Sequence, residues 1–245
     1  MRKRWNLIKG SIIGVSFFML LFGLATVTRA DLKEEGMYFS ILGVENDIEG
    51  DFDGTVIGSF EGSTVLVRIP NIERGRGFGL LIGGYNGNIA GELYYSCTNH
   101  DTSFWFSDLN HNGLNDLGAE DTIYYTDGEC QVLGANVKYY FLNLFKKNVR
   151  VFGQLGFFVP KISIEQGAYK QGDLLSVGDV TFTGYGADLG LGILIHLHPY
   201  LAINGAAVFR EIRIREVTAF DQDRVPTKST YGTGRSYSVG LNYFF

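Results

Sequence analysis

Eight successive segments of this chain alternate apolar residues with glycine and small polar residues, and this pattern constrains the fold most strongly. Segment 181–197 shows it clearly. Its apolar positions are Tyr185, Ala187, Leu189, Leu191, Ile193 and Ile195, and its polar or small positions are Gly184, Gly186, Asp188, Gly190 and Gly192. A two-residue period is typical of a β-strand with two unlike faces. No long stretch has the 3.6-residue period of an amphipathic helix, so the sequence predicts an all-β protein.

The composition of the polar positions indicates which face is the core. In a soluble barrel the apolar face points inward and the other face is charged, whereas a membrane barrel inverts this arrangement. Here the polar positions carry mainly Gly, Ser and Asn with single charges, and only 19% of the chain is charged. Three phenylalanines, Phe152, Phe158 and Phe244, interrupt the polar positions. Glycine-rich positions suit a narrow lumen in which larger side chains would collide, so the apolar face is expected to contact lipid.

The links between the segments alternate in length. Short links cover 86–88, 142–148 and 196–199, and long polar stretches cover 46–76, 98–129, 163–179 and 216–230. Short turns at one end and long loops at the other are typical of membrane barrels. We therefore predict an eight-stranded antiparallel up-and-down transmembrane β-barrel with short periplasmic turns and long extracellular loops. The alternative is ten strands, with a further hairpin formed by residues 55–69.

The N-terminal residues have the form of a secretory signal peptide. Residues 1–30 contain a basic start, an apolar stretch and the ending Thr28-Arg29-Ala30, which predicts cleavage there and a barrel domain over 31–245. Cleavage removes five of the 21 basic residues and none of the 26 acidic ones, so the mature chain has a net charge of −10. An acidic, aromatic-rich chain is unlike a nucleic-acid-binding protein.

The sequence also resembles the small OmpA-like outer-membrane β-barrel family. The resemblance covers about residues 36–245, through stretches such as NVKYYF and GYGADLGLGILIHLHPYLAINGAAVF and through the ending YFF. It implies a location in the outer membrane, in contact with outer-membrane lipid. It also implies that the outer-membrane assembly machinery reads the aromatic C-terminal strand, with Tyr243 and Phe245 as the signal. The last strand is expected to close the barrel against the first, because an open sheet edge is not stable in lipid. We expect a monomer.

Four charged residues fall on the lumenal positions of the predicted strands. Glu92 and Lys138 have matching heights on neighbouring strands, and so do Asp188 and Arg210. Because an unpaired charge in a confined lumen is costly, we predict two ion pairs. They are interpreted as a structural plug or, alternatively, as a gate whose pairs break to admit water.

The second long loop contains two further candidate features. Asp108, Asn110, Asn112 and Asp116 have the spacing of a calcium-binding loop, with Ala119 where a bidentate acid is expected. Calcium is the one cofactor considered. Cys97 and Cys130 bracket the loop, and a disulfide between them is predicted because oxidation is permitted after export.

The sequence favours a structural or surface-interaction role for these acidic loops, with an extracellular partner that the sequence does not identify. A small gated pore for ions or solutes is the alternative. An outer-membrane enzyme is a minor one, because none of the four histidines has the spacing of a Ser/His/acid triad. We therefore expect a protein without catalytic activity.

Overall fold

The computed structural model describes residues 35–50, 55–60, 63–68, 71–105, 123–145, 147–171, 174–219 and 225–245. The predicted signal peptide, residues 1–30, lies outside this range. Eight long strands form the wall: β1 (Glu35–Gly50), β5 (Gly75–Asn86), β6 (Ile89–Trp105), β7 (Ile123–Leu144), β8 (Val149–Gln171), β9 (Leu174–His198), β10 (Leu201–Ala219) and β11 (Val225–Phe244). In the described part of the chain, no helix has the length and apolar character needed to cross a membrane.

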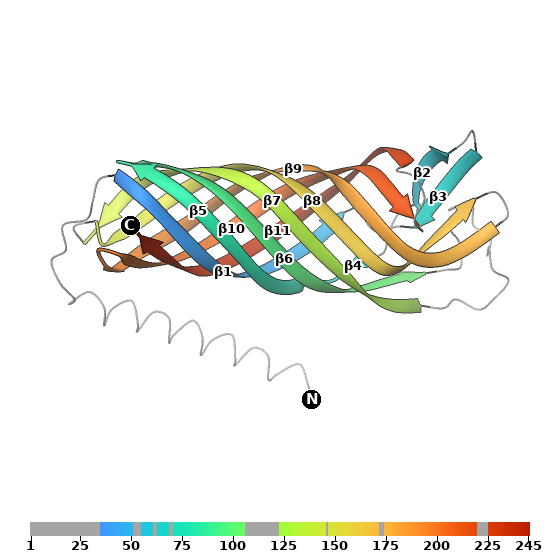
Figure 1. Cartoon of the computed structure of the whole chain (residues 1–245), viewed down its shortest axis with the longest axis horizontal. Coiled ribbons are helices and arrows are strands. Elements are labelled where there is room, and N and C mark those ends of the chain that lie inside the picture. Colours follow the sequence, from blue (N-terminus) through green and yellow to red (C-terminus); the bar gives the residue numbers. More distant parts are fainter. Residues whose placement is uncertain are drawn as a thin grey trace, which may run out of the picture.

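Each long strand pairs antiparallel with the next, and β11 pairs with β1 to close the barrel (Figure 1). The closing register runs from Tyr38 opposite Phe244 to Gly50 opposite Gly232. Beyond the last strand residue, the Phe245 amide donates to the Met37 carbonyl at 3.0 Å. The predicted eight-stranded antiparallel barrel is therefore confirmed, together with its closure by the C-terminal strand.

The two ends of the barrel differ. At one end, here called the short-turn end, brief links join β5 to β6 through Gly87 and Asn88, β7 to β8, and β9 to β10 through Pro199 and Tyr200. The opposite end is called the extended end. There β8 continues to Gln171 and β9 starts at Leu174, so the prediction of a long loop over 163–179 is wrong. Main-chain pairing does not require apolar side chains, and the strands therefore continue beyond the point where the alternation fades.

Residues 55–69 do not add two strands to the membrane wall. Strands β2 (Thr55–Phe60) and β3 (Ser63–Arg68) form the expected hairpin, but at the extended end. There β3 pairs with β8 beside Gln171, and β2 pairs with β11 at Thr227. At the extended end, the hairpin thus joins β8, β9, β10 and β11 in a second, six-stranded circuit (Figure 1). The ten-stranded alternative is wrong for the membrane wall. A short strand, β4 (Asn71–Ile72), pairs with β6.

The wall has its apolar face outside. Neighbouring residues of β6 illustrate this inversion, since Leu93 is 61% exposed and Glu92 is 4% exposed. The aromatic residues nearest the short turns also point outward, among them Tyr139, Phe141, Tyr243 and Phe245. An exposed apolar band bordered by aromatic residues is typical of a barrel surface that faces lipid.

Candidate functional site: the barrel lumen

Glycines make the room that large lumenal side chains fill. Phe152 of β8 lies opposite Gly192 of β9, and Phe158 lies opposite Gly186. A Cβ atom on Gly192 would come within 2.2 Å of the Phe152 ring, and one on Gly186 within 2.2 Å of the Phe158 ring. Phe152 and Phe158, two of the three phenylalanines that interrupt the polar positions, therefore pack over glycines of the adjacent strand. These phenylalanine–glycine pairs were not predicted from the sequence. An aromatic residue opposite a glycine at a lumenal position would have indicated them.

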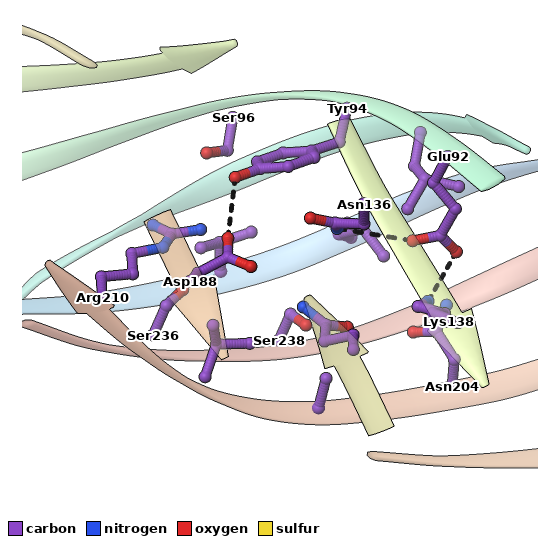
Figure 2. A pocket seen from close by; sticks show the side chains of 16 residues that line it. Glu92, Tyr94, Ser96, Asn136, Lys138, Asp188, Asn204, Arg210, Ser236 and Ser238 are labelled. Carbon is purple, nitrogen blue, oxygen red and sulfur yellow. Dashed lines mark hydrogen bonds and ion pairs between the residues drawn. The ribbon is translucent and has the colours of Figure 1, made fainter. Parts of the chain in front are cut away.

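Glu92 and Lys138 form an ion pair in the lumen. The Lys138 Nζ atom lies 2.5 Å from Glu92 Oε1, and both side chains are almost fully buried. The Tyr38 hydroxyl donates to the same carboxylate oxygen, and Asn136 Nδ2 donates to Oε2 at 3.5 Å. Figure 2 shows Glu92 held between Asn136 and Lys138. The carboxylate thus has partners on both oxygens, as a buried charge requires.

Asp188 and Arg210 do not form the predicted ion pair, although they lie directly opposite each other on β9 and β10. Among the described residues, Arg210 instead donates from Nη1 to Asn46 Oδ1 at 3.0 Å, and Asp188 Oδ2 accepts from the Tyr94 hydroxyl at 3.2 Å (Figure 2). The register was sufficient for a pair, but neutral partners on other strands hold the two charged groups apart.

A small polar cavity of about 40 Å³ lies between these groups. Four polar atoms beside it are buried and have no protein partner within the described part of the chain: Ser96 Oγ, Asn136 Oδ1, Asp188 Oδ1 and Arg210 Nε. A water site needs roughly 10 to 15 Å³, so the cavity has room for a few water molecules that would bridge these atoms. The middle of the lumen is thus polar but narrow.

An apolar layer closes the lumen between this polar section and the extended end. Along β10, Arg210 is followed at lumenal positions by Ile212 and Ile214, both buried. On β8 and β9, Phe182 lies opposite Ile162 and Val180 opposite Ile164. These residues are among the most buried in the protein. The apolar layer therefore separates the polar lumen from the extended end.

Cys97 and Cys130 are both free, so the predicted disulfide is wrong. The register places Thr98, not Cys97, opposite Cys130. Because successive residues of a strand point to opposite faces, the two thiols lie on opposite sides of the wall. Cys97 lies on the outer face, and Cys130 is buried on the lumenal face.

The remaining predicted residues are located as follows. Tyr243 and Phe245 lie on the outer face at the short-turn end, 55% and 53% exposed. The candidate calcium ligands Asp108, Asn110, Asn112 and Asp116 lie outside the described residues, and calcium binding stays a prediction. Calcium addition that changes neither thermal stability nor loop proteolysis would refute it.

The extended end carries an acidic concavity of about 980 Å³, which the sequence did not single out. Its lining includes the carboxylates of Asp101, Asp127, Glu129, Glu165 and Asp179. At its edge, Arg74 binds Asp47 at 3.0 Å and Glu45 at 3.3 Å. Asp47 raises the pKa of Arg74, while burial lowers the pKa of the neighbouring His100. Arg74 is therefore paired with carboxylates of β1, as is Arg76, which binds Glu45 at 2.8 Å. Acidic groups thus dominate the concavity.

No family model and no curated protein matches the sequence. Solved structures match the fold. The outer membrane protein OprG from Pseudomonas aeruginosa has a TM-score of 0.51 at 14% identity, over 89% of this chain and 99% of that one. Neisserial surface protein A (NspA) has a TM-score of 0.48 at 13% identity, over 87% and 100%. The chain spans nearly the whole length of both. The fold of an outer-membrane protein agrees with the outer-membrane location predicted from the sequence.

Proposed function

We propose that this protein, a small barrel with the fold of bacterial outer-membrane proteins, is a closed scaffold that acts through the surface its strands build beyond the membrane. The filled lumen is the observation that carries this proposal. Tyr38, Phe152, Phe158 and Phe182 are each at most 1% exposed, and an eight-stranded barrel has an interior that side chains can fill completely. The lumenal residues Glu92 and Asp188 are each 4% exposed, which supports a structural rather than a catalytic role.

The acidic concavity supports a surface-interaction role. In outer-membrane barrels the end opposite the short turns faces the exterior. Asp101 and Asp127 lie directly opposite each other on β6 and β7, and like charges in that position destabilise a sheet. A partner with basic groups would relieve this repulsion, and long-range attraction would accelerate its association. The proposed partner class is therefore a basic protein or peptide outside the cell.

Conductance distinguishes a closed scaffold from a pore. The mature chain, refolded and inserted in a planar bilayer, is expected to show no discrete openings. Folding is checked in parallel by the shift in gel mobility on heating. Discrete openings of the correctly folded chain would contradict a closed lumen.

Binding of a basic probe tests the surface role. Oligolysine is titrated against the full barrel in uncharged detergent micelles at low salt. The variant Asp127→Asn with Glu165→Gln is expected to bind more weakly, and added salt should weaken binding to the native protein. Lys161→Gln is the control. It changes the outer face of β8 by removing a cation instead of an acid, and it should not weaken binding. Equal binding by the native protein and the double variant would count against the acidic surface.

A small gated pore remains the second candidate, because the middle of the lumen is polar and holds the cavity of about 40 Å³. Opening would require the Lys138–Glu92 pair to break and the apolar layer to rearrange. In that case Lys138→Ala should alter the conductance of the refolded barrel. An unchanged conductance would exclude gating by this pair.

A further inference from the structure

Arg150 is a buried cation at the short-turn end of the barrel. It is 8% exposed. Its Nη2 atom donates to the Gly87 carbonyl at 2.7 Å and to Asn88 Oδ1 at 3.3 Å, and its Nε atom donates to Asn143 Oδ1 at 3.1 Å. The guanidinium carbon also lies 3.9 Å from the centre of the Tyr140 ring. Each of these partners is neutral.

Arg150 has no carboxylate partner among the described residues. Lys138, the lumenal cation nearer the middle of the barrel, is in contrast neutralised by Glu92 at 2.5 Å. A buried charge without a counter-charge is costly, and neutral oxygens compensate it only in part. The charge of Arg150 therefore remains available to an anion.

A cavity of about 240 Å³ adjoins Arg150. This is well above the roughly 15 Å³ that one water needs. Lys147, Arg150 and His196 line it, none of its described lining residues is acidic, and Tyr85 and Phe244 form aromatic walls. Because turn residues Gly87 and Pro199 also line it, the cavity lies at the end of the barrel rather than in the membrane centre. It is a cationic pocket at the short-turn end.

His196 supplies a second polar group without a partner. Its Nδ1 atom is buried and has no hydrogen bond within the described part of the chain. The His196 backbone amide binds the Asn148 carbonyl at 2.7 Å, and its ring lies 5.2 Å from the Phe244 ring. The ring is thus held in place, and in the tautomer with a proton on Nδ1 this N–H group has no partner in the described part of the chain.

We propose that this cavity binds a phosphate group through Arg150 and His196. Charge-assisted hydrogen bonds from a guanidinium to phosphate are among the strongest in proteins. The bonds described above use Nε and Nη2 of Arg150, so the N–H groups of Nη1 are the ones proposed to donate to the phosphate. Lys147 adds positive charge at the edge. The phosphate is either a free ion or the headgroup of a phospholipid, and the inference is independent of the surface role proposed above.

Titration with inorganic phosphate tests the proposal. The full mature chain is refolded in maltoside micelles, which contain no phosphate, and the NMR signals of the His196 ring and Arg150 Nε are followed. Saturable shifts of both signals are expected. His196→Gln should weaken phosphate binding by about tenfold, the typical effect of losing one hydrogen bond to a charged group. Arg150→Lys keeps the charge but loses the fork, and is expected to weaken it further.

Two variants keep the test decisive. Because Arg150 ties the turns together, Arg150→Lys can impair folding, but His196→Gln leaves those bonds intact. Arg76→Gln, which removes an exposed cation at the extended end, is the matched control and should leave the affinity unchanged. Shifts that fail to saturate, or an affinity equal in the native protein and His196→Gln, would overturn the proposal.

A second arm distinguishes the two sources of phosphate. The barrel is placed in phosphatidylglycerol nanodiscs in phosphate-free buffer. If the lipid headgroup enters the cavity, the bound His196 signal appears without added phosphate. If the signal stays in its free position until inorganic phosphate is added, the ligand is the free ion. Both outcomes support the site and assign its ligand.

Discussion

Lys138 Nζ lies 2.5 Å from Glu92 Oε1, although the two residues are not direct cross-strand neighbours. The register pairs Glu92 with Asn136 and Lys138 with Ala90. The ion pair is therefore diagonal, and the long lysine side chain spans two positions along the lumen. The Lys138 Nζ atom also lies 4.5 Å from the centre of the Phe152 ring, so the pair is held between neighbouring strands and an aromatic face.

Breaking this pair from one side should destabilise the barrel strongly. Lys138→Met leaves Glu92 as a buried charge without a cation, and is expected to lower the free energy of unfolding by about 3 to 5 kcal/mol. Lys138→Met combined with Glu92→Gln removes both charges and should recover much of this loss. Urea unfolding in micelles, followed by circular dichroism, measures the effect. A double variant no more stable than Lys138→Met alone would show that the charge is not the cause.

The sequence predicted the wall better than the lumenal contacts. Strand periodicity, glycine content and matching heights were enough to place Glu92, Lys138, Asp188 and Arg210 inside the barrel. They did not determine which partner each side chain takes, because rotamers depend on residues of distant strands. Asn46, 164 positions from Arg210 in the sequence, accepts a hydrogen bond from the guanidinium that was predicted to form an ion pair with Asp188. Neutral amides and hydroxyls carry no pattern that marks them as partners of a charge.

Space over a lumenal glycine should also contribute to the stability of the barrel. A Cβ atom on Gly192 would lie 2.2 Å from Phe152 Cζ and 2.6 Å from the Gly205 carbonyl oxygen. Since the carbonyl belongs to the wall, the strain cannot be relieved by a rotamer change alone. We expect Gly192→Ala to lower the free energy of unfolding by about 1 to 3 kcal/mol.

Gly91→Ala is the matched control for that variant. A Cβ atom there has no heavy atom within 4 Å, and its effect should stay within about 0.5 kcal/mol. Urea unfolding of the two variants under identical conditions makes the comparison. Equal losses would mean that strand propensity, and not contact with Phe152, explains the role of glycine.

The cysteines show where counting along two strands is insufficient. Cys97 and Cys130 lie at similar heights, but Cys97 is on an outward position and Cys130 is on a lumenal one. The outward parity of β7, which includes Leu133 and Val137, was already visible in the sequence, and it excludes Cys130 from the face that carries Cys97. The prediction of a disulfide used the similar positions of the two cysteines along their strands and ignored the face on which each one lies. For that reason it was wrong.

Thiol chemistry checks this arrangement. In the folded barrel, a membrane-permeant maleimide should modify Cys97 before Cys130, and both should react after unfolding. Treatment with a mild oxidant should not lower the intact mass by the two hydrogens that disulfide formation removes. Cys97→Ser and Cys130→Ser serve as controls for the assignment of each label. An intact mass of the native protein that is lower by two hydrogens would show a disulfide and would contradict the observed register.

Phe245 should act in assembly as well as in the closing seam, and two variants separate these roles. Deleting Phe245 removes the 3.0 Å bond from its amide to the Met37 carbonyl, whereas Phe245→Ala keeps that bond and removes only the outward ring. If the ring is an assembly signal, Phe245→Ala should lower the amount of heat-modifiable barrel in cells and leave refolding in micelles unchanged. If the ring only anchors the strand in lipid, both measurements should fall together. Quantifying folded barrel in cell envelopes and in micelles therefore decides between recognition by the assembly machinery and simple interfacial anchoring.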